Sequence, residues 1–558
     1  MIILYIFLSF AQVLLLPGLL FCAYKKSFNF FKIISISIIS NYLIIILISN
    51  FSFDKKIFLL ILIIFEVILI SYYLKNINKV YLINFTLDNY KTINLVLISF
   101  IFYFLFLIFG KQYATLFEEG DVLLSWNEWS YNLLGSTYTP DYLEKNNFEN
   151  AFKTAQSRSY YGQLIPASWS IFYALTNMTD LTMYPKFLNF LFSFLAIIYL
   201  VKNYILEDNQ LYILILLLIT YFFFKEHAIL VYSGMVDASF SIFIFLSLAH
   251  IVNFEKKFDE DKIIISILFA SIASNIKLLG CFYSIIFLPI YIIYNYKIPR
   301  KKLFFYLCLL LITSLFWPIY QFLFYNNNIF SNNNLEYLNS LSVNSIESGI
   351  DRIRNLFNNK IDFIFFSLML FISCFNKKTN FISIFLVIPY LVIWYNFSSY
   401  DVRNILVIIP ILCLLSSFII LKLFKKIKIF KKKIFFTKKV IFSQQLINKL
   451  ILLTMILIIP IFLLFNEQYE KKLIQGISDK KKLIKNEELN LYLINNLNNI
   501  DVIITDYIYL RYVLNKHEKS LIYICDMYQK ENIQHCLLEK INNIILVTYY
   551  GDELKKKN

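Results

Sequence analysis

Glycine is scarce in this chain: its 558 residues include 10 glycines and 10 prolines. Nucleotide-binding loops that hold phosphate on backbone amides need several closely spaced glycines, and neither a Gly-x-Gly-x-x-Gly pattern nor a P-loop pattern occurs. Any phosphate group would therefore be held by Arg, Lys or Tyr side chains.

Cysteine is also rare, with seven residues and no spacing typical of a zinc site. In an apolar segment a thiol usually acts as a small hydrophobic side chain. Five lie in such segments: Cys22, Cys281, Cys308, Cys374 and Cys413. Cys525 and Cys536 lie in the polar C-terminal region, where they would pair in an oxidising compartment or stay as free thiols.

Charged residues make up only 16% of the chain, whereas 59% is hydrophobic and 19% aromatic, with a mean hydropathy of +0.62. A soluble protein has about a quarter charged residues, so the composition predicts a polytopic membrane protein. The net charge of +16 comes from lysines gathered in short links between apolar runs. This pattern reflects membrane topology rather than binding of nucleic acid.

The fold class we expect is all-α and polytopic, with about 14 transmembrane helices of roughly 20 residues each. A large extracytoplasmic first loop and a small C-terminal α/β domain complete it. The predicted spans are 2–23, 28–50, 57–74, 93–110, 182–201, 209–224, 235–253, 262–276, 278–296, 303–324, 361–376, 379–397, 402–424 and 448–466.

The basic links set the orientation of these spans. Residues 1–20 have no basic region in front, and Lys25 and Lys26 follow them, which favours a first span with its N-terminus outside over a cleaved signal peptide. Nearly every strongly basic link then falls inside, the exception being Lys55 and Lys56 beside Asp54. The polar features described below share the opposite face, which predicts one extracytoplasmic site.

Three regions follow: N-terminal helices over 1–92, a catalytic core over 93–466 with the loop 111–181, and an extracytoplasmic C-terminal domain over 467–558. In the last region short apolar runs at 501–505, 521–525 and 543–548 alternate with helical intervals, which predicts a parallel sheet. This domain would cap the site, contact the acceptor, or serve only as a structural appendage.

The loop 111–181 carries the candidate catalytic carboxylates Glu118, Glu119 and Asp121. A carboxylate near an apolar surface is desolvated and becomes a better base, although each of the three could equally be a solvated loop residue. Asp121 is favoured because it precedes an amphipathic run, residues 122–134, expected on the membrane surface with Trp126 and Trp129 at headgroup level.

Other candidates would bind substrate. Glu128 follows Asp121 by about two helical turns. Arg158 and Tyr161 precede a turn into the apolar run 167–175, and Asp237 opens a span, where a carboxylate needs a partner. Lys277 lies between two apolar segments and Arg403 at the start of another. Ordinary surface pairing of Arg158, and snorkelling of the other two cations, are the alternatives.

These residues resemble the GT-C superfamily of integral-membrane glycosyltransferases, which contains protein O-mannosyltransferases and the aminoarabinose transferase acting on lipid A. The resemblance extends weakly over about residues 93–424. Its residues are Asp121 with Ser125-Trp126-Asn127-Glu128-Trp129, the Tyr161-Gly162 to Pro166 segment, Asp237, Lys277-Leu278-Leu279-Gly280 and Tyr400-Asp401-Val402-Arg403-Asn404. Three extra spans precede the usual first one, and the paired acids of the family appear as Glu118-Glu119-x-Asp121. The choice of base among them therefore stays open.

The resemblance implies transfer of a sugar from a polyprenyl-phosphate donor to a hydroxyl of a lipid, glycan or protein acceptor. Asp121 would be the base, and Lys277, Arg403 and Arg158 would stabilise the departing phosphate. No cofactor is required, although the carboxylates would also suit a divalent metal ion. The implied location is the bacterial inner membrane, with the active site outside.

Two alternatives come from other classes. A transporter or flippase of lipid-linked glycans should carry mid-membrane charges or Gly/Pro-broken spans, whereas here the charges are expected at span ends. A polysaccharide polymerase or ligase would have an arginine-rich outer loop, whereas the loop 111–181 has Arg158 as its one arginine.

Overall fold

The computed structural model describes a little under half of the chain. The described residues are 2–49, 51, 53–75, 126, 128–133, 162–176, 183–200, 236–252, 259–277, 279–325, 360–374, 377–395, 407–416, 419, 502–505, 522–523 and 544–547. The candidates Glu118, Glu119, Asp121, Arg158, Tyr161 and Arg403 lie outside them.

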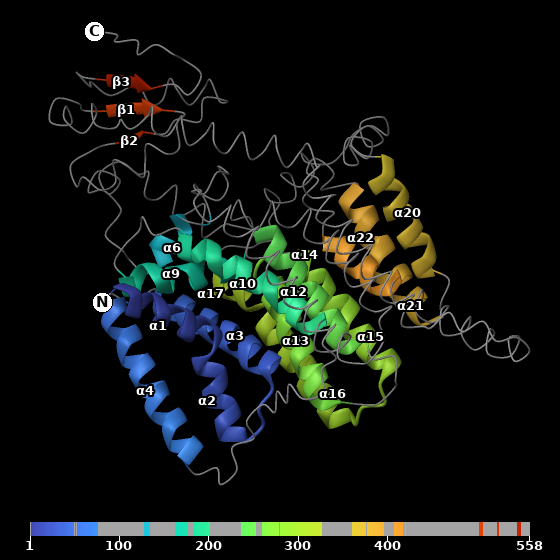
Figure 1. Cartoon of the computed structure of the whole chain (residues 1–558), viewed down its shortest axis with the longest axis horizontal. Helices are drawn as coiled ribbons and strands as arrows, with labels where there is room; N and C mark the ends of the chain where they lie inside the picture. The colour runs from blue at the N-terminus through green and yellow to red at the C-terminus, as the bar shows by residue number, and fades with distance from the viewer. Residues whose placement is uncertain are drawn as a thin grey trace, which may run out of the picture.

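Helices dominate this part of the chain (Figure 1). The first group comprises α1 (Ile2–Leu14), α2 (Leu16–Lys25), α3 (Phe30–Ser49), α4 (Lys55–Lys75), α6 (Glu128–Leu133), α9 (Leu164–Thr176) and α10 (Met183–Leu200). The second comprises α12 (Val236–Ile251), α13 (Glu260–Ser274), α14 (Leu279–Cys281), α15 (Leu288–Asn295), α16 (Arg300–Ser314), α17 (Phe316–Tyr325), α20 (Lys360–Cys374), α21 (Lys377–Ile382) and α22 (Ile388–Ile393). Wider π-helical turns, Phe282–Phe287 and Ser383–Val387, lead into α15 and α22.

At least two of these helices are long and apolar enough to cross a membrane, α3 and α4. The count among the described residues rises to four if the bent pairs α1 with α2 and α16 with α17 are each one span. The chain therefore contains helices suited to membrane insertion. The larger number of spans stays a prediction, because 93–110, 209–224 and 448–466 lie outside the described residues.

Proline explains why two predicted spans are not straight. The structure replaces the continuous helices expected at 2–23 and 303–324 by pairs bent by 49° and 57°. Pro17 and Pro318 lie in the first turn of the second helix of each pair. A proline ring clashes with the carbonyl four residues earlier and provides no N–H donor. Continuing the first helix through these positions is therefore unfavourable.

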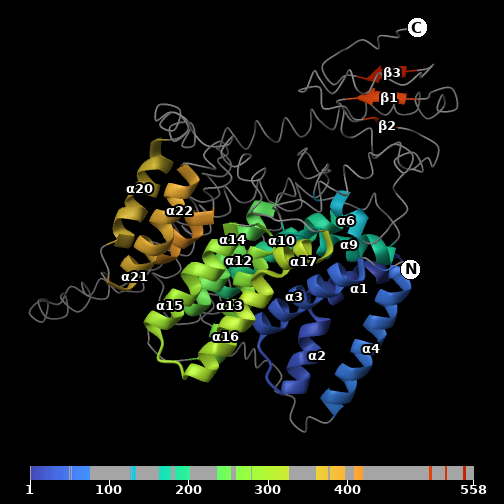
Figure 2. The ribbon, with the colours of Figure 1, turned by 180° about the vertical axis from the view of Figure 1, so that it is seen from behind.

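The centre of the bundle is α12, in which every residue from Val236 to Ile251 is buried. A helix that is apolar on all sides is stable only when surrounded, and α12 packs against α10 and α13 (Figure 2). Near its end the buried His250 stacks against Phe31, Tyr199 and Phe269. His250 is therefore part of the aromatic packing around the end of α12.

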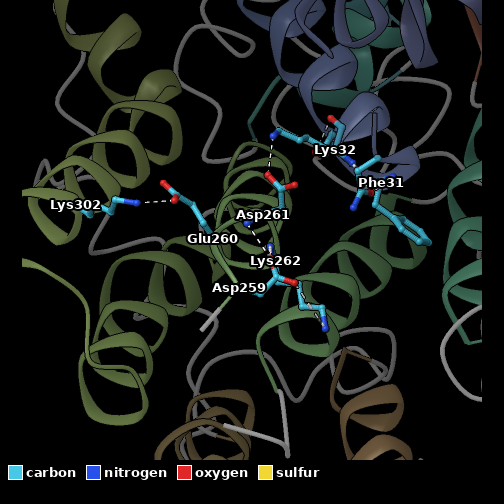
Figure 3. A network of polar contacts seen from close by, with 9 residues as sticks. Phe31, Lys32, Asp259, Glu260, Asp261, Lys262 and Lys302 are labelled. Carbon is cyan, nitrogen blue, oxygen red and sulfur yellow. Dashed lines mark hydrogen bonds and ion pairs between the residues drawn. The ribbon is translucent and has the colours of Figure 1, made fainter. Parts of the chain in front are cut away.

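Ion pairs connect the N-termini of α3, α13 and α16 at one end of the bundle (Figure 3). The Lys32 Nζ lies 2.7 Å from Asp261 Oδ1, and the Lys302 Nζ lies 2.6 Å from Glu260 Oε2. Asp259 caps α13 by accepting the N–H groups of Asp261 and Lys262. The N-termini of these three helices therefore meet at one end of the structure.

Replacing Lys302 by methionine should lower stability by no more than about 1 kcal/mol, because the Lys302 and Glu260 side chains are 48% and 46% exposed. Lys32→Met should cost more, since the Lys32 side chain is only 9% exposed. Thermal unfolding of both variants in detergent shows whether Lys32→Met loses more stability than Lys302→Met. Equal losses would contradict the idea that burial separates the two pairs.

The same contact gives a pH dependence. The hydrogen bond from Lys302 lowers the pKa of Glu260 below its ordinary value. A carboxylate with a depressed pKa in the folded state stabilises the protein above its unfolded pKa, and this contribution is lost as the pH falls through the folded pKa. Lys302→Met should therefore weaken the acid sensitivity of unfolding, and the small difference should be seen only in the acidic range.

Three short strands occur in the C-terminal region: β1 (Val502–Thr505), β2 (Ile522–Tyr523) and β3 (Ile544–Val547). They form a parallel sheet in the order β2-β1-β3, with Ile503 opposite both Ile522 and Ile545. These strands coincide with the three apolar runs recognised in the sequence. The segments between them lie outside the described residues.

Candidate functional site

Two of the residues singled out in the sequence, Asp237 and Lys277, form an ion pair, although they lie 40 positions apart. Asp237 is in the first turn of α12 and Lys277 follows the end of α13. The Lys277 Nζ donates to Asp237 Oδ1, and the two side chains are 13% and 7% exposed. The partner that a carboxylate at this depth requires is thus Lys277.

The position of each residue favours its charge. The first turn of a helix carries a partial positive charge, which stabilises a carboxylate such as Asp237. Lys277 is fixed by its backbone, because its N–H donates to the Ala273 carbonyl at 3.2 Å and its own carbonyl accepts the Gly280 N–H at 2.8 Å. Lys277 therefore lies in a hydrogen-bonded turn between α13 and α14, facing Asp237 at the start of α12.

The start of α9 packs against this turn without space for a side chain. A Cβ built on Gly162 would lie 1.9 Å from the Asn275 carbonyl oxygen, and the Leu164 N–H donates to that oxygen at 3.1 Å. Gly280 is similarly close, with its added Cβ 2.7 Å from the Ala273 carbonyl carbon. These glycines are needed because two backbones approach each other directly.

Asn275 connects this turn to α16. Its Nδ2 donates to the Ser271 and Thr313 carbonyls, both at 2.7 Å, so both amide hydrogens are used. Its Oδ1 is buried and has no hydrogen-bond partner among the described residues. The ends of α9, α13 and α16 therefore meet beside the Asp237–Lys277 pair.

A fourth element reaches the same place. Asp237 acts electrostatically on the hydroxyl of Tyr390, a buried residue of α22. Segments separated by more than two hundred residues, from Gly162 to Tyr390, thus border one ion pair. This end of the bundle is opposite the one that holds Lys32 and Lys302.

Gly162→Ala should destabilise the protein by about 1–3 kcal/mol, because the new methyl group meets backbone rather than a flexible side chain. Ala167→Ser is a suitable control, since it also adds one heavy atom to buried α9. Thermal unfolding in detergent provides the measurement. If Gly162→Ala unfolds like wild type, α9 does not approach Asn275 as described.

Of the remaining candidates, Glu128 is the first residue of α6, and only its backbone position is described. The carboxylates Glu118, Glu119 and Asp121 lie outside the described residues, as do Arg158, Tyr161 and Arg403. Among the described residues, no group of three or more His, Cys, Asp or Glu side chains could hold a metal ion.

The surroundings of Glu128 differ from the prediction. Trp126 and Trp129, expected at the headgroup level of the bilayer, are only 4% and 7% exposed, and their rings make an edge contact with centroids 5.2 Å apart. The helix α6 packs on α9, which is itself buried along nearly its whole length although it belongs to the predicted loop 111–181. With 13 residues α9 is shorter than an ordinary span, so the assignment of 111–181 to a loop stays a prediction.

Sequence reasoning also missed Glu66. It is the twelfth of 21 residues of α4, and its side chain is buried at 4% exposure. The expectation that charged residues occur only at span ends is therefore wrong. A lone carboxylate inside an apolar run was the signal that could have identified it.

Comparison with known proteins finds no relative: no family model matches this chain, nor does any curated protein or solved structure.

Proposed function

We propose that this protein is a membrane glycosyltransferase that transfers a sugar from a polyprenyl-phosphate donor to an acceptor hydroxyl outside the cytoplasm. The observation that carries the proposal is the Asp237–Lys277 pair. Two residues chosen for their resemblance to GT-C enzymes lie together, and the predicted outer segments containing Gly162 and Asn275 meet beside them. A bundle of apolar helices with a polar outer end suits a donor whose lipid tail stays in the bilayer.

In the proposed reaction Asp121 takes the proton of the acceptor hydroxyl. The acceptor oxygen then forms a bond to the anomeric carbon as the bond from that carbon to the phosphate oxygen breaks. The polyprenyl phosphate leaves with the electron pair, and the configuration inverts. Because phosphate is a good leaving group, no general acid is needed, and nearby cations stabilise its growing charge.

The ion pair changes what is expected of Lys277. Asp237 compensates its charge and orients its side chain, so the pair as a whole is close to neutral. We therefore assign Lys277 to positioning the donor phosphate by hydrogen bonding. Arg403 and Arg158 are the better candidates for balancing the developing negative charge.

Membranes containing the protein test the proposal with a panel of tritium-labelled polyprenyl-phosphate sugars. Label should move from the organic-soluble donor to an acceptor, and membranes without the protein should show no such transfer. Reporter tags inserted in 111–181 should report an extracytoplasmic position. Absence of transfer from every donor in a membrane where the tagged protein is folded, or a cytosolic tag, would overturn the proposal.

A transporter of lipid-linked glycans is the second candidate, and two findings favour it. Glu66 is a buried carboxylate in the middle of a span, and the helix pairs around Pro17 and Pro318 are broken. Both features are typical of transporters. Liposomes with a fluorescent lipid-linked sugar decide between the two functions, because a flippase moves the label across the bilayer with no change in its covalent structure.

A further inference from the structure

Glu66 faces the inside of the bundle on a helix that is otherwise largely exposed. The buried positions of α4 form one stripe along the helix, and this stripe consists of Lys55, Leu59, Ile63, Glu66 and Ile70. On the other faces Ile61, Ile64 and Ile68 are each about 60% exposed. An outward-facing Glu66 would contact lipid. Because Glu66 faces inward, its contacts with the neighbouring helices determine whether its carboxyl group is ionised.

The first of these contacts is with α1. The side-chain amide of Gln12, which is fully buried, faces the Glu66 carboxyl and interacts with it. Gln12 is held in turn by Asn41 of α3, because its Nε2 donates to Asn41 Oδ1 at 2.9 Å. Glu66 thus connects α4 to α1 and, through Gln12, to α3.

The orientation of these amides is fixed by Asn41. Its Nδ2 donates to two carbonyl oxygens, those of Gln12 at 2.6 Å and Ser37 at 2.8 Å. Turning the Asn41 amide over would place its oxygen against both carbonyls, so Oδ1 must face Gln12. Gln12 must therefore present Nε2 to Asn41, which leaves its Oε1 as an acceptor elsewhere.

Two buried oxygens remain without a donor. Gln12 Oε1 and Glu66 Oε2 have no hydrogen-bond partner among the described residues. Both belong to side chains that are at least nine-tenths buried and that interact with each other. A buried polar atom without a partner is destabilising, so a missing hydrogen is indicated.

No described cation is placed to neutralise Glu66: Lys55, on the same stripe of α4, is eleven residues away and donates to the Ile48 and Phe51 carbonyls. The neighbouring helices α1 and α9 contain no charged residue, and their titratable groups are Tyr5 and Tyr173. In α2 these groups are Cys22, Tyr24 and Lys25. The Tyr24 ring contacts Tyr73, seven residues beyond Glu66 and so roughly 10 Å along α4, which places Lys25 near the end of that helix. At the other end, the Lys56 Nζ lies over the Tyr5 ring.

We propose that Glu66 binds a proton in the folded protein and forms an intramembrane acid–amide pair with Gln12. One hydrogen on Glu66 Oε2 turns this oxygen into a donor, and Gln12 Oε1 becomes its acceptor, so a single proton satisfies both buried atoms. The ligand of this site is the proton itself. Release of the proton would leave an uncompensated charge between α1 and α4, so it requires separation of these helices or entry of water.

Infrared difference spectroscopy of the full-length protein in detergent tests this site. The spectrum of wild type minus Glu66→Gln at neutral pH should show the carbonyl band of a protonated carboxylic acid, shifted to lower frequency in heavy water. Glu260→Gln is the matched control: it removes an exposed carboxylate paired with Lys302, and its difference spectrum should show the bands of an ionised carboxylate. An ionised carboxylate in the Glu66 spectrum would overturn the proposal.

A measurement of folding stability tests the same proposal in a second way. Because glutamine resembles the protonated acid, Glu66→Gln should keep the folding equilibrium constant within about tenfold of wild type at neutral pH, a difference of at most about 1.4 kcal/mol. A larger loss would mean that Glu66 is needed as an anion. If wild type is stabilised by sodium ions and Glu66→Gln is not, the site binds a metal cation instead, and the proton assignment fails. Glu66→Leu gives an independent infrared comparison, and its difference spectrum should show the same band of a protonated carboxylic acid.

Discussion

Replacing Asp121 by asparagine should lower the rate of sugar transfer by about 10²- to 10⁴-fold, the usual contribution of a general base. Asparagine keeps the size of the side chain but cannot accept the proton of the acceptor hydroxyl. The loss should therefore occur in kcat, with little change in the KM for the donor. Initial rates with a labelled polyprenyl-phosphate sugar provide the measurement.

The acidic loop itself contains the controls for this prediction. Glu118→Gln and Glu119→Gln test the two neighbouring carboxylates, and the variant with the largest loss in kcat identifies the base. Asp141→Asn removes another carboxylate from the same predicted loop and should leave transfer unchanged. Equal rates of transfer for wild type, Asp121→Asn, Glu118→Gln and Glu119→Gln would exclude these three carboxylates from the chemistry.

Breaking the Asp237–Lys277 pair should cost about 3–5 kcal/mol of stability, because removal of one partner leaves the other charge buried and uncompensated. Asp237→Asn and Lys277→Met should each show this loss in detergent unfolding. The double variant should recover much of it, since neither charge remains. Because the double variant should lose less than either single variant, the coupling energy between the two positions should be at least as large as one single loss, about 3 kcal/mol or more.

Transfer activity distinguishes a structural pair from one that also positions substrate. If Lys277 holds the donor phosphate, the double variant should fold well but show a raised KM for the donor. Reversing the pair should not restore function fully, because lysine at position 237 would face the positive end of the α12 dipole. Additive losses in the double variant would contradict the contact itself.

The sequence alone identified the main helices correctly where hydropathy was decisive. Expected spans at 28–50 and 57–74 correspond to α3 and α4, and 235–253 corresponds to α12. The pattern of short apolar runs likewise located β1 to β3. These predictions succeeded because burial and membrane insertion both act on the average polarity of a segment. They did not decide α9, whose 13 residues are too few for an ordinary span.

Average polarity along the chain was enough to locate helices suited to a membrane and to show that isolated ionic residues such as Asp237 and Lys277 needed an explanation. It could not show that they explain each other, because contacts between residues 40 apart depend on how α12 and α13 pack. The same limit hid the Glu66–Gln12 contact, which joins α4 to α1. Partner choice for a buried polar group is decided by the helix that fills the space opposite it, and only tertiary packing determines which helix that is.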